Sequence, residues 1–327
     1  MRALALFSGG LDSMLAAKKV ADMGIEVIAI HVKIGFGSKK DIEDLLRQRA
    51  SIAGASFRII DVREEYIQKI LFNPVHGYGK NFNPCIDCHG YMFRIAKELM
   101  REIDASFIIT GEVLGQRPMS QRSDAMKLVS RLANDESEKL ILRPLSAKLM
   151  EPTTPEKEGW VDREKLLDIS GRSRDRQIAM AAEYGWEEYE SPGGGCLLTD
   201  IHYSQRIKEH ISHDSFELED IEILKFGRHF RLPDNAKLIV GRDEADNEAL
   251  KRIDSHKYIP IALPVIGPFS LISSSASSAD KELAARIAIT YAKSNKDELY
   301  DVTIGDKVYS VAAFVSKQDT HRYFFNA

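Results

Sequence analysis

Two sets of residues in this 327-residue chain have types and spacings that suit chemistry. Segment 8–13 reads SGGLDS: its two glycines let a ligand approach the backbone, and its hydroxyls and carboxylate can contact that ligand. The other set is the three cysteines, Cys85, Cys88 and Cys196. An odd number of cysteines does not suit a disulfide framework, whereas three thiols can share one metal or sulfur site.

Segment 8–13 lies between an apolar run, residues 3–7, and a helical pattern, residues 14–23. This order predicts a strand, a glycine turn and a helix, with the turn at the edge where open parallel sheets bind ligands. The helix start offers N–H groups to an anion, and Asp12 suits a role in orienting the loop or holding Mg²⁺. The segment is neither a Walker A loop nor a dinucleotide fingerprint, because it lacks both Gly-Lys-Ser/Thr and a third glycine.

The SGG-x-D-S pattern resembles the PP-loop of the ATP pyrophosphatase superfamily, whose members split ATP between its α- and β-phosphates and adenylate a substrate oxygen. The resemblance implies that ATP and Mg²⁺ bind here and that Asp12 takes part in catalysis. It also implies that the backbone around Ile30 and His31 reads adenine. The loop residues expected to bind ATP are Ser8, Gly9, Gly10, Leu11, Asp12 and Ser13.

Strands and helices alternate through the first half of the chain. The expected strands are residues 3–7, 25–32, 56–62 and 107–110, and the expected helices are residues 39–53, 66–71 and 91–103, with a polar loop over 73–88. This alternation predicts an α/β fold with a parallel sheet covered by helices on both faces. With the PP-loop, it indicates a PP-loop domain of the adenine nucleotide alpha hydrolase-like (HUP) class, which we assign to residues 1–205.

Residues 110–121, TGEVLGQRPMSQ, follow the last of these strands and should lie at the same sheet edge as segment 8–13. They resemble the TGE-x-LGQ-x-x-SQ segment of the 4-thiouridine synthetase (ThiI) family. Residues 92–99 and 140–147 are similar to that family in order and spacing. The resemblance implies that the nucleotide site is completed by Thr110, Gly111 and Gln116.

Segment 83–89, NPCIDCH, closes a loop and opens a helix, a setting that favours thiolates. It resembles the cysteine loop of the tRNA 2-thiouridylase (MnmA) family, with Cys88 at that family's cysteine, and Cys196 matches the second catalytic cysteine. With Cys85, the set is also similar to the three cysteines that hold a [4Fe–4S] cluster in TtuA-type tRNA thiolases. Two sulfur chemistries therefore stay open, a persulfide with a resolving thiol and a cluster. Zinc is less favoured because it would need His89 as its fourth ligand.

The sequence changes character near residue 200. We expect a linker over 206–219, with an acidic hinge over 214–222, and a smaller α+β domain over 220–327. In this domain the expected strands are 221–232, 237–240, 259–266, 300–304 and 308–315, the expected helix is 280–293, and the serine-rich residues 270–278 are an expected flexible loop that caps this helix. The domain resembles the NFACT-R RNA-binding domain. The resemblance implies phosphate contacts from Lys225, Arg228, His229, Arg231 and Arg242.

RNA contacts are also expected in the first domain, because cationic side chains lie beside its active-site motifs. These are Arg117, Arg122, Arg172 and Arg174. The net charge of −4 gives no global sign of nucleic-acid binding, so RNA contacts must come from local patches. We expect no THUMP domain or rhodanese tail, both of which occur in many 4-thiouridine synthetases, so RNA capture falls to residues 220–327.

The expected activity is ATP-dependent tRNA thiolation, in which a uridine carbonyl oxygen is adenylated and sulfur then displaces AMP. The expected partners are tRNA and a sulfur donor, either a cysteine desulfurase or sulfide. No apolar run approaches the ~20 residues of a membrane helix and no signal peptide is visible, so a cytoplasmic location is expected. Two alternatives stay open: a PP-loop ligase or amidotransferase that adenylates a carboxylate, and an RNA-binding factor with a vestigial ATPase.

Overall fold

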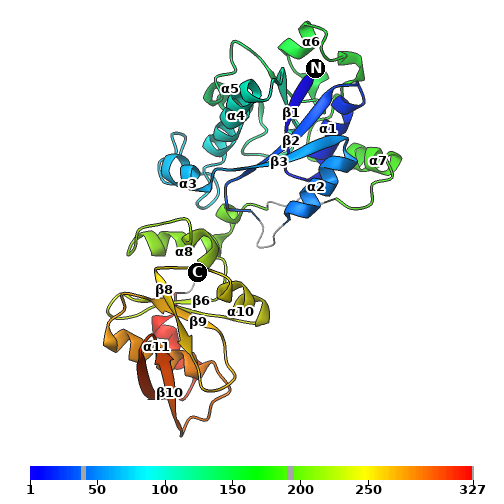
Figure 1. Ribbon diagram of the computed structural model, residues 1–327. Coiled ribbons are helices and arrows are strands. Elements are labelled where there is room, and N and C mark those ends of the chain that lie inside the picture. The colour runs from blue at the N-terminus through cyan, green and yellow to red at the C-terminus, as the bar shows by residue number, and fades with distance from the viewer. Residues whose placement is uncertain (38–41, 190–194, 326–327) are drawn as a thin grey trace. The chain divides into compact units, whose positions relative to one another are not determined.

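The computed structural model describes residues 1–37, 42–189 and 195–325. The chain divides into two compact units, Met1–Thr199 and Asp200–Ala327 (Figure 1). The division precedes the expected 206–219 linker, and the first part of that linker is helix α8 (Ile201–Ile211). The helix belongs to the second unit because Tyr203 is buried there and its hydroxyl donates to the carbonyl of Ile221 at 2.9 Å.

The first unit is built on a parallel five-stranded sheet, as the alternation predicts (Figure 1). Its strands are β1 (Arg2–Leu6), β2 (Glu26–Lys33), β3 (Ala55–Asp61), β4 (Phe107–Thr110) and β5 (Ile141–Leu142). They lie in the order β3-β2-β1-β4-β5, and all four neighbouring pairs are parallel. Strand β4 is apolar but for Thr110 and buried at every position, as expected for a strand with both faces covered.

Helices connect these strands and cover the sheet. They are α1 (Leu11–Ala21), α2 (Glu43–Ile52), α3 (Arg63–Tyr66) with a π-helical turn at Ile67–Leu71, α4 (Cys85–Glu102), α5 (Ser123–Leu132), α6 (Thr154–Lys157) and α7 (Asp175–Glu183). Helix α4 begins six residues before the expected position, so Cys85 and Cys88 lie in its first turn rather than in a loop. The carboxylate of Asp87 accepts the backbone N–H groups of Val75 and His76, each at 3.0 Å, and so holds the preceding loop against this turn.

The strand order reverses at β1. The chain runs from β1 to β2 and β3 on one side of the sheet and then returns to β4 on the other side. The segments that follow β1 and β4 therefore leave the same edge of the sheet at adjacent positions, at the switch point where open α/β sheets bind ligands. Segments 8–13 and 110–121 are these two connections.

The second unit is a smaller α+β fold, which confirms the predicted class. Its antiparallel sheet has the order β11-β10-β8-β9-β7-β6. The strands are β6 (Arg228–Arg231), β7 (Lys237–Val240), β8 (Tyr258–Ala262), β9 (Ser270–Ser273), β10 (Leu299–Ile304) and β11 (Lys307–Ala312), and the further helices are α9 (Asp220–Ile223), α10 (Glu244–Lys251) and α11 (Ser278–Thr290). Leu238 and Val240 pack in the core around α11, while Ile239 packs in a second cluster with Leu250 of α10.

Two expectations for this unit are wrong. Residues 270–273 form strand β9 inside the sheet, not a flexible loop, because Leu271 and Ile272 are buried in different apolar clusters. The expected strand 221–232 begins as helix α9, and only its residues 228–231 form a strand. Ser277 does cap α11, where its side chain accepts the N–H of Asp280 at 3.0 Å. In the described part of the chain, no helix combines the length and apolar character needed to cross a bilayer.

Candidate functional site

The SGGLDS loop forms a tight turn between β1 and α1. Gly9 has a φ of +75°, and a Cβ atom there would lie 2.2 Å from Leu46 Cδ2, so the turn requires glycine. The Ser8 hydroxyl accepts the Gly10 N–H at 3.3 Å, and the Ser13 hydroxyl donates to the Gly10 carbonyl at 2.7 Å. Leu11, the first residue of α1, is fully buried. The loop therefore leads directly into a helix start, where free N–H groups favour an anion.

Asp12 joins the loop to two other segments. Gln116, in the connection after β4, donates from Nε2 to Asp12 Oδ2 at 2.7 Å. Gln177 of α7 donates to Gln116 Oε1 at 3.1 Å, and Arg174 Nε lies 3.9 Å from Asp12 Oδ1. Three segments of the first unit thus meet at one carboxylate, and the structure brings Asp12 and Gln116, which were each predicted for the nucleotide site, into direct contact.

Thr110 and Gly111 complete this edge. Thr110 ends β4 and is buried. A Cβ atom on Gly111 would lie 2.4 Å from the backbone nitrogen of Ser13, so only glycine allows the two connections to approach this closely. The sequence places Gly111 in the nucleotide site by resemblance, and the structure supplies the steric reason for glycine at this position.

Ile30 and His31 lie on β2 beside the loop. Ile30 is buried, and its carbonyl accepts the Phe7 N–H at 2.9 Å. His31 Nδ1 lies 3.1 Å from the Phe7 carbonyl, and burial, aided by Lys33, lowers the pKa of His31. His31 is therefore neutral at pH 7. Recognition of adenine by this backbone stays a prediction.

The three cysteines gather beside the first turn of α4. The segment that carries Cys196 is tied to the loop before α4, because Leu198 accepts the Phe82 N–H at 3.1 Å and Thr199 accepts the Asn81 side-chain amide at 2.7 Å. All three thiols are free, and only Cys88 is buried. Residues 191–194 of the glycine run before Cys196 lie outside the described residues.

The three thiols have different acidities. Burial raises the pKa of Cys88 well above its usual value, and nearby thiolates add to this effect. Burial likewise raises the pKa of Cys196 to about 11. Burial opposes ionisation of Cys85 too, but hydrogen bonds from His89 and Ser120 and the charge of Arg117 outweigh it and lower its pKa. Cys85 is thus the thiol most readily ionised.

A buried ion-pair network lies beside Cys85, and the sequence does not predict it. His89 Nδ1 lies 3.0 Å from Glu112 Oε1, and Glu112 Oε2 accepts from Arg143 Nε at 3.0 Å. Burial lowers the pKa of His89, but its hydrogen bonds with Cys85 and Glu112 raise it to about 10. Glu112 and Arg143 both lie in segments that resemble the ThiI family, residues 110–121 and 140–147. Their residue types were therefore noted, but nothing in the sequence indicates that the two side chains pair across the fold.

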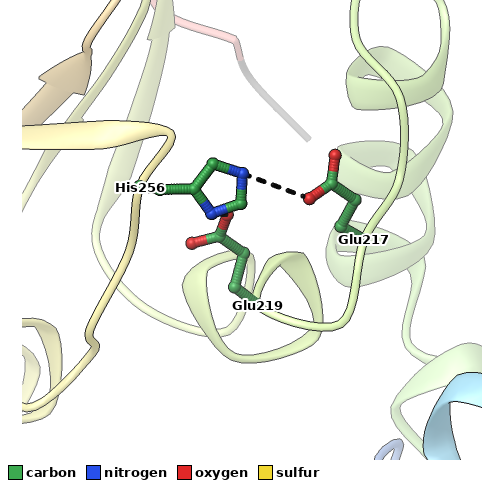
Figure 2. A group of neighbouring side chains, drawn as sticks. All are labelled: Glu217, Glu219 and His256. Carbon is green, nitrogen blue, oxygen red and sulfur yellow. Dashed lines mark ion pairs between the residues drawn. The ribbon is translucent and has the colours of Figure 1, made fainter.

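Donor groups within reach of a single metal ion occur elsewhere. Across the described residues, Glu217, Glu219 and His256 of the second unit have ligand atoms that all lie within 4.8 Å of one another (Figure 2). His256 Nδ1 lies 3.2 Å from Glu219 Oε1, and Lys257 Nζ lies 3.2 Å from Glu217 Oε1. Lys257 pairs with Glu217, as in an ordinary surface ion-pair network. The three described cysteines do not form such a close group.

The arginines predicted to bind RNA in the first unit separate into two groups. Arg117, Arg122 and Arg172 are exposed, and Arg122 pairs with Asp124 at 3.2 Å. Arg174 is buried beside Asp12, so little of its side chain is open to an RNA backbone, and its RNA contact stays a prediction. Its position puts it with the nucleotide loop.

The predicted cations of the second unit are engaged inside it. Lys225 is buried and pairs with Glu222 at 2.6 Å. Arg228 donates to the Gly241 carbonyl at 3.0 Å, and Arg231 pairs with Glu209 at 2.6 Å. His229 is buried, and Arg242 is bound to Asp246. These contacts organise the unit, and RNA binding by these side chains stays a prediction, with His229 and Lys225 the least accessible of them.

Comparisons with known proteins match the two units separately. A family model described as "Thiamine biosynthesis protein (ThiI)" matches residues 1–149, and one described as "NFACT protein RNA binding domain" matches residues 227–323. A curated tRNA-specific 2-thiouridylase MnmA of Clostridioides difficile is 26% identical over 220 residues, which cover 62% of this chain and 57% of that protein. A probable tRNA sulfurtransferase of Thermococcus kodakarensis is 28% identical over 183 residues, covering 56% and 43%.

The chain spans less than two thirds of the length of these relatives. Among solved structures, a 4-thiouridine synthetase–RNA complex with bound ATP aligns with a TM-score of 0.40 and 18% identity, over 68% of this chain and 52% of that one. By these family models, residues 1–149 are similar to the ThiI family and residues 227–323 are similar to NFACT-type RNA-binding domains.

Proposed function

We propose that this chain is an ATP-dependent tRNA sulfurtransferase of the cytoplasm that converts a tRNA uridine into a thiouridine. One observation carries the proposal: a single segment, 110–121, connects an adenylation site to a thiol site. Its Gln116 holds the PP-loop carboxylate, and its Glu112 holds the histidine beside Cys85. The ThiI-family match, the names of the thiolating relatives and the NFACT match support the same function.

The first step activates the base. A uridine carbonyl oxygen bonds to the α-phosphorus of ATP, and pyrophosphate leaves with the electron pair of the broken P–O bond. The hydroxyls of Ser8 and Ser13 and the helix start hold the phosphates, and Asp12 Oδ1, which has no hydrogen-bond partner among the described residues, is available to Mg²⁺. Bound Mg²⁺ would neutralise charge on the phosphates. The step is needed because AMP leaves far more readily than a carbonyl oxygen.

The second step installs sulfur. In the persulfide route a cysteine desulfurase passes its persulfide sulfur to the Cys196 thiol and regains its own thiol, because sulfide alone cannot form a persulfide without an oxidant; sulfide can serve as donor only in the cluster route. In a persulfide route, the outer sulfur on Cys196 attacks the activated carbon, and AMP departs with the former carbonyl oxygen. Cys85 then attacks the inner sulfur and releases thiouridine, leaving a disulfide that a dithiol reductant must reduce. Cys85 suits this role because its pKa is lowered. A [4Fe–4S] cluster on the three thiolates would instead supply an open iron position for hydrosulfide.

The test is a reconstituted reaction. Anaerobically purified protein is mixed with ATP, a dithiol, tRNA that lacks thiouridine, and either sulfide or a cysteine desulfurase with cysteine, and nucleosides are analysed by mass spectrometry. We expect thiouridine and an equal amount of AMP, no pyrophosphate release with Asp12→Asn, and pyrophosphate release without thiouridine with Cys85→Ser. Full activity of the cysteine variants on a carboxylate substrate would favour the ligase. Absence of AMP with every RNA would favour an RNA-binding factor.

A further inference from the structure

Arg174 differs from the arginines that surround it in the sequence. Arg172 is exposed, and Arg176 is exposed and pairs with Asp168 at 2.8 Å. Arg174 is only 9% exposed, yet its Nε atom has no hydrogen-bond partner among the described residues. Burying a cation is unfavourable unless it is paired and hydrogen-bonded, so the Nε atom needs a hydrogen-bond partner that its site must supply.

The partner is not Asp12 alone. Arg174 Nε lies 3.9 Å from Asp12 Oδ1, beyond hydrogen-bond distance, and Oδ1 is itself buried without a hydrogen bond to any described residue. The other oxygen, Oδ2, is held by Gln116 at 2.7 Å, so the carboxylate is fixed in orientation. A cation and a carboxylate with orphaned atoms thus face each other at the end of a loop whose glycines suit a phosphate.

The fold fixes Arg174 in this place. The turn before α7 is anchored to the connection after β4, because Gly171 donates its N–H to the Leu114 carbonyl at 2.8 Å and Leu114 pairs with Ser170 as an isolated β-bridge. Ser146 ties the same two segments together, accepting the Leu114 N–H at 3.0 Å and donating to the Ile169 carbonyl at 2.7 Å. Arg174 is therefore positioned by the backbone before any ligand binds.

We infer that Arg174 binds the β,γ-pyrophosphate of ATP above the PP-loop and holds it as it leaves. The inference rests on the proposed function insofar as that function assigns ATP to segment 8–13. When the α–β P–O bond breaks, negative charge grows on the departing pyrophosphate, and a fixed guanidinium stabilises that charge. Mg²⁺ on Asp12 Oδ1 and Arg174 would then contact the phosphates from two sides, which gives both orphaned groups a partner.

The test measures binding to the full chain by calorimetry, with ATP, inorganic pyrophosphate and AMP, each with Mg²⁺. Arg174→Met keeps the aliphatic stem and removes the charge. We expect it to weaken ATP and pyrophosphate binding by about tenfold or more, with AMP binding changed by less than about twofold. Arg174→Lys should restore part of the loss, since it returns a charge but not the planar fork. Arg176→Met is the matched control and should bind all three ligands as the wild type does.

The outcomes separate the two claims. Pyrophosphate binding unchanged in Arg174→Met overturns the inference, and so does a loss confined to tRNA affinity, which would return Arg174 to the RNA surface. If Arg174→Met does not fold, the Arg174→Lys variant decides: pyrophosphate affinity equal to that of the wild type overturns the inference. A wild-type protein that binds no pyrophosphate overturns the inference as well. Wild-type protein that binds pyrophosphate through Arg174 but forms no thiouridine leaves the inference standing and refutes the proposed function.

Discussion

Glu112 is the residue that joins the two halves of the site. It lies two residues after β4, and each of its oxygens faces a cation, His89 on one side and Arg143 on the other. Burial raises the pKa of Glu112, but Arg143 and His89 outweigh that effect and hold the pKa below its usual value. The carboxylate is therefore charged at neutral pH, and its stabilising effect is lost only as the pH falls through its folded-state pKa.

Glu112→Gln should destabilise the first unit by about 3 kcal/mol, because it leaves Arg143 buried without a counter-charge. The measurement is urea unfolding at pH 7, and the difference from the wild type should shrink under acidic conditions as Glu112 protonates. Glu151→Gln is the control: that carboxylate also pairs with a cationic side chain, Lys139, but is 87% exposed. Its loss should cost much less, because solvent screens an exposed ion pair. Equal effects of the two substitutions would contradict a structural role for Glu112.

The helices and strands could be predicted from the sequence where a local pattern of apolar residues determines them. The β1–loop–α1 unit and the parallel sheet follow from apolar runs alternating with helical patterns, and the structure confirms both. The start of helix α4 and the whole of strand β9 were predicted wrongly because their local composition, a polar loop that runs into CxxC and a serine run, favours other structures. The fold places them by long-range contacts, Asp87 with the 75–76 backbone and β9 between β7 and β8. No local signal reports such contacts.

Long-range contacts also decide which cationic side chains are buried or paired, and so the sequence does not indicate this. Sequence spacing cannot distinguish Arg172 from Arg174, since burial of one depends on Leu114 and Asp12, which are distant in the chain. In the second unit, Lys237 of β7 is buried because Glu209, on α8, binds both it and Arg231. A linker is expected from the sequence over 206–219, where the structure has the second half of α8 with Glu209. Nothing in the sequence therefore indicates a partner for Arg231 of β6 or Lys237 of β7, whereas the structure pairs both with Glu209.

Lys237 should give the second unit a characteristic pH dependence. Burial lowers the pKa of Lys237 to about 8, against the opposing attraction of Glu209, whereas the unfolded value is 10.5. Between these values the unfolded chain binds more protons than the folded one, so this group makes stability rise with pH, by an amount on the order of 3 kcal/mol. Lys237→Met should abolish this rise, measured by urea unfolding from pH 7 to 10. Identical slopes in variant and wild type would show that the pKa of Lys237 is not lowered in the folded protein.

For the whole molecule, the boundary at Asp200 decides which fragment can be studied alone. Arg206 of α8 donates to the Leu224 carbonyl at 3.0 Å, and Glu209 neutralises Lys237 and Arg231. A fragment 200–327 should therefore unfold cooperatively, whereas a fragment 220–327 should not, because it leaves these two cations without their counter-charge. Circular dichroism and thermal melts of the two fragments check this. Equal cooperativity would mean that α8 adds nothing to the unit.

The longer fragment also tests RNA capture. The NFACT match at residues 227–323 leads us to expect that fragment 200–327 binds tRNA, with an affinity that falls steeply as salt rises because phosphate contacts release counterions. Filter binding at several salt concentrations measures the slope. A fragment that folds but binds no tRNA, or binds it without salt dependence, would move RNA capture to the first unit, where Arg117 and Arg172 are exposed.

The sulfur chemistry is decided by what the three cysteines hold. A single zinc ion brings its sulfur ligands to within about 4 Å of one another, and the sulfurs of the three described cysteines do not all lie within 4.8 Å. The sulfur ligands of a [4Fe–4S] cluster are spaced more widely, and three thiolates leave one iron free for sulfur in transit. We therefore expect anaerobically purified protein to be brown, with about four iron and four sulfide ions per chain.

Two variants distinguish the remaining routes. Cys196→Ser should lose the iron and the visible absorption, whereas His89→Ala should keep both, because His89 serves Cys85 as a hydrogen-bond partner and not as a metal ligand. Zinc that is lost in both variants would indicate a four-ligand site instead. Chelation gives the final comparison: thiolation that stops when iron is removed and returns with iron and sulfide requires the cluster, while a colourless, metal-free protein with full activity assigns the same cysteines to the persulfide route.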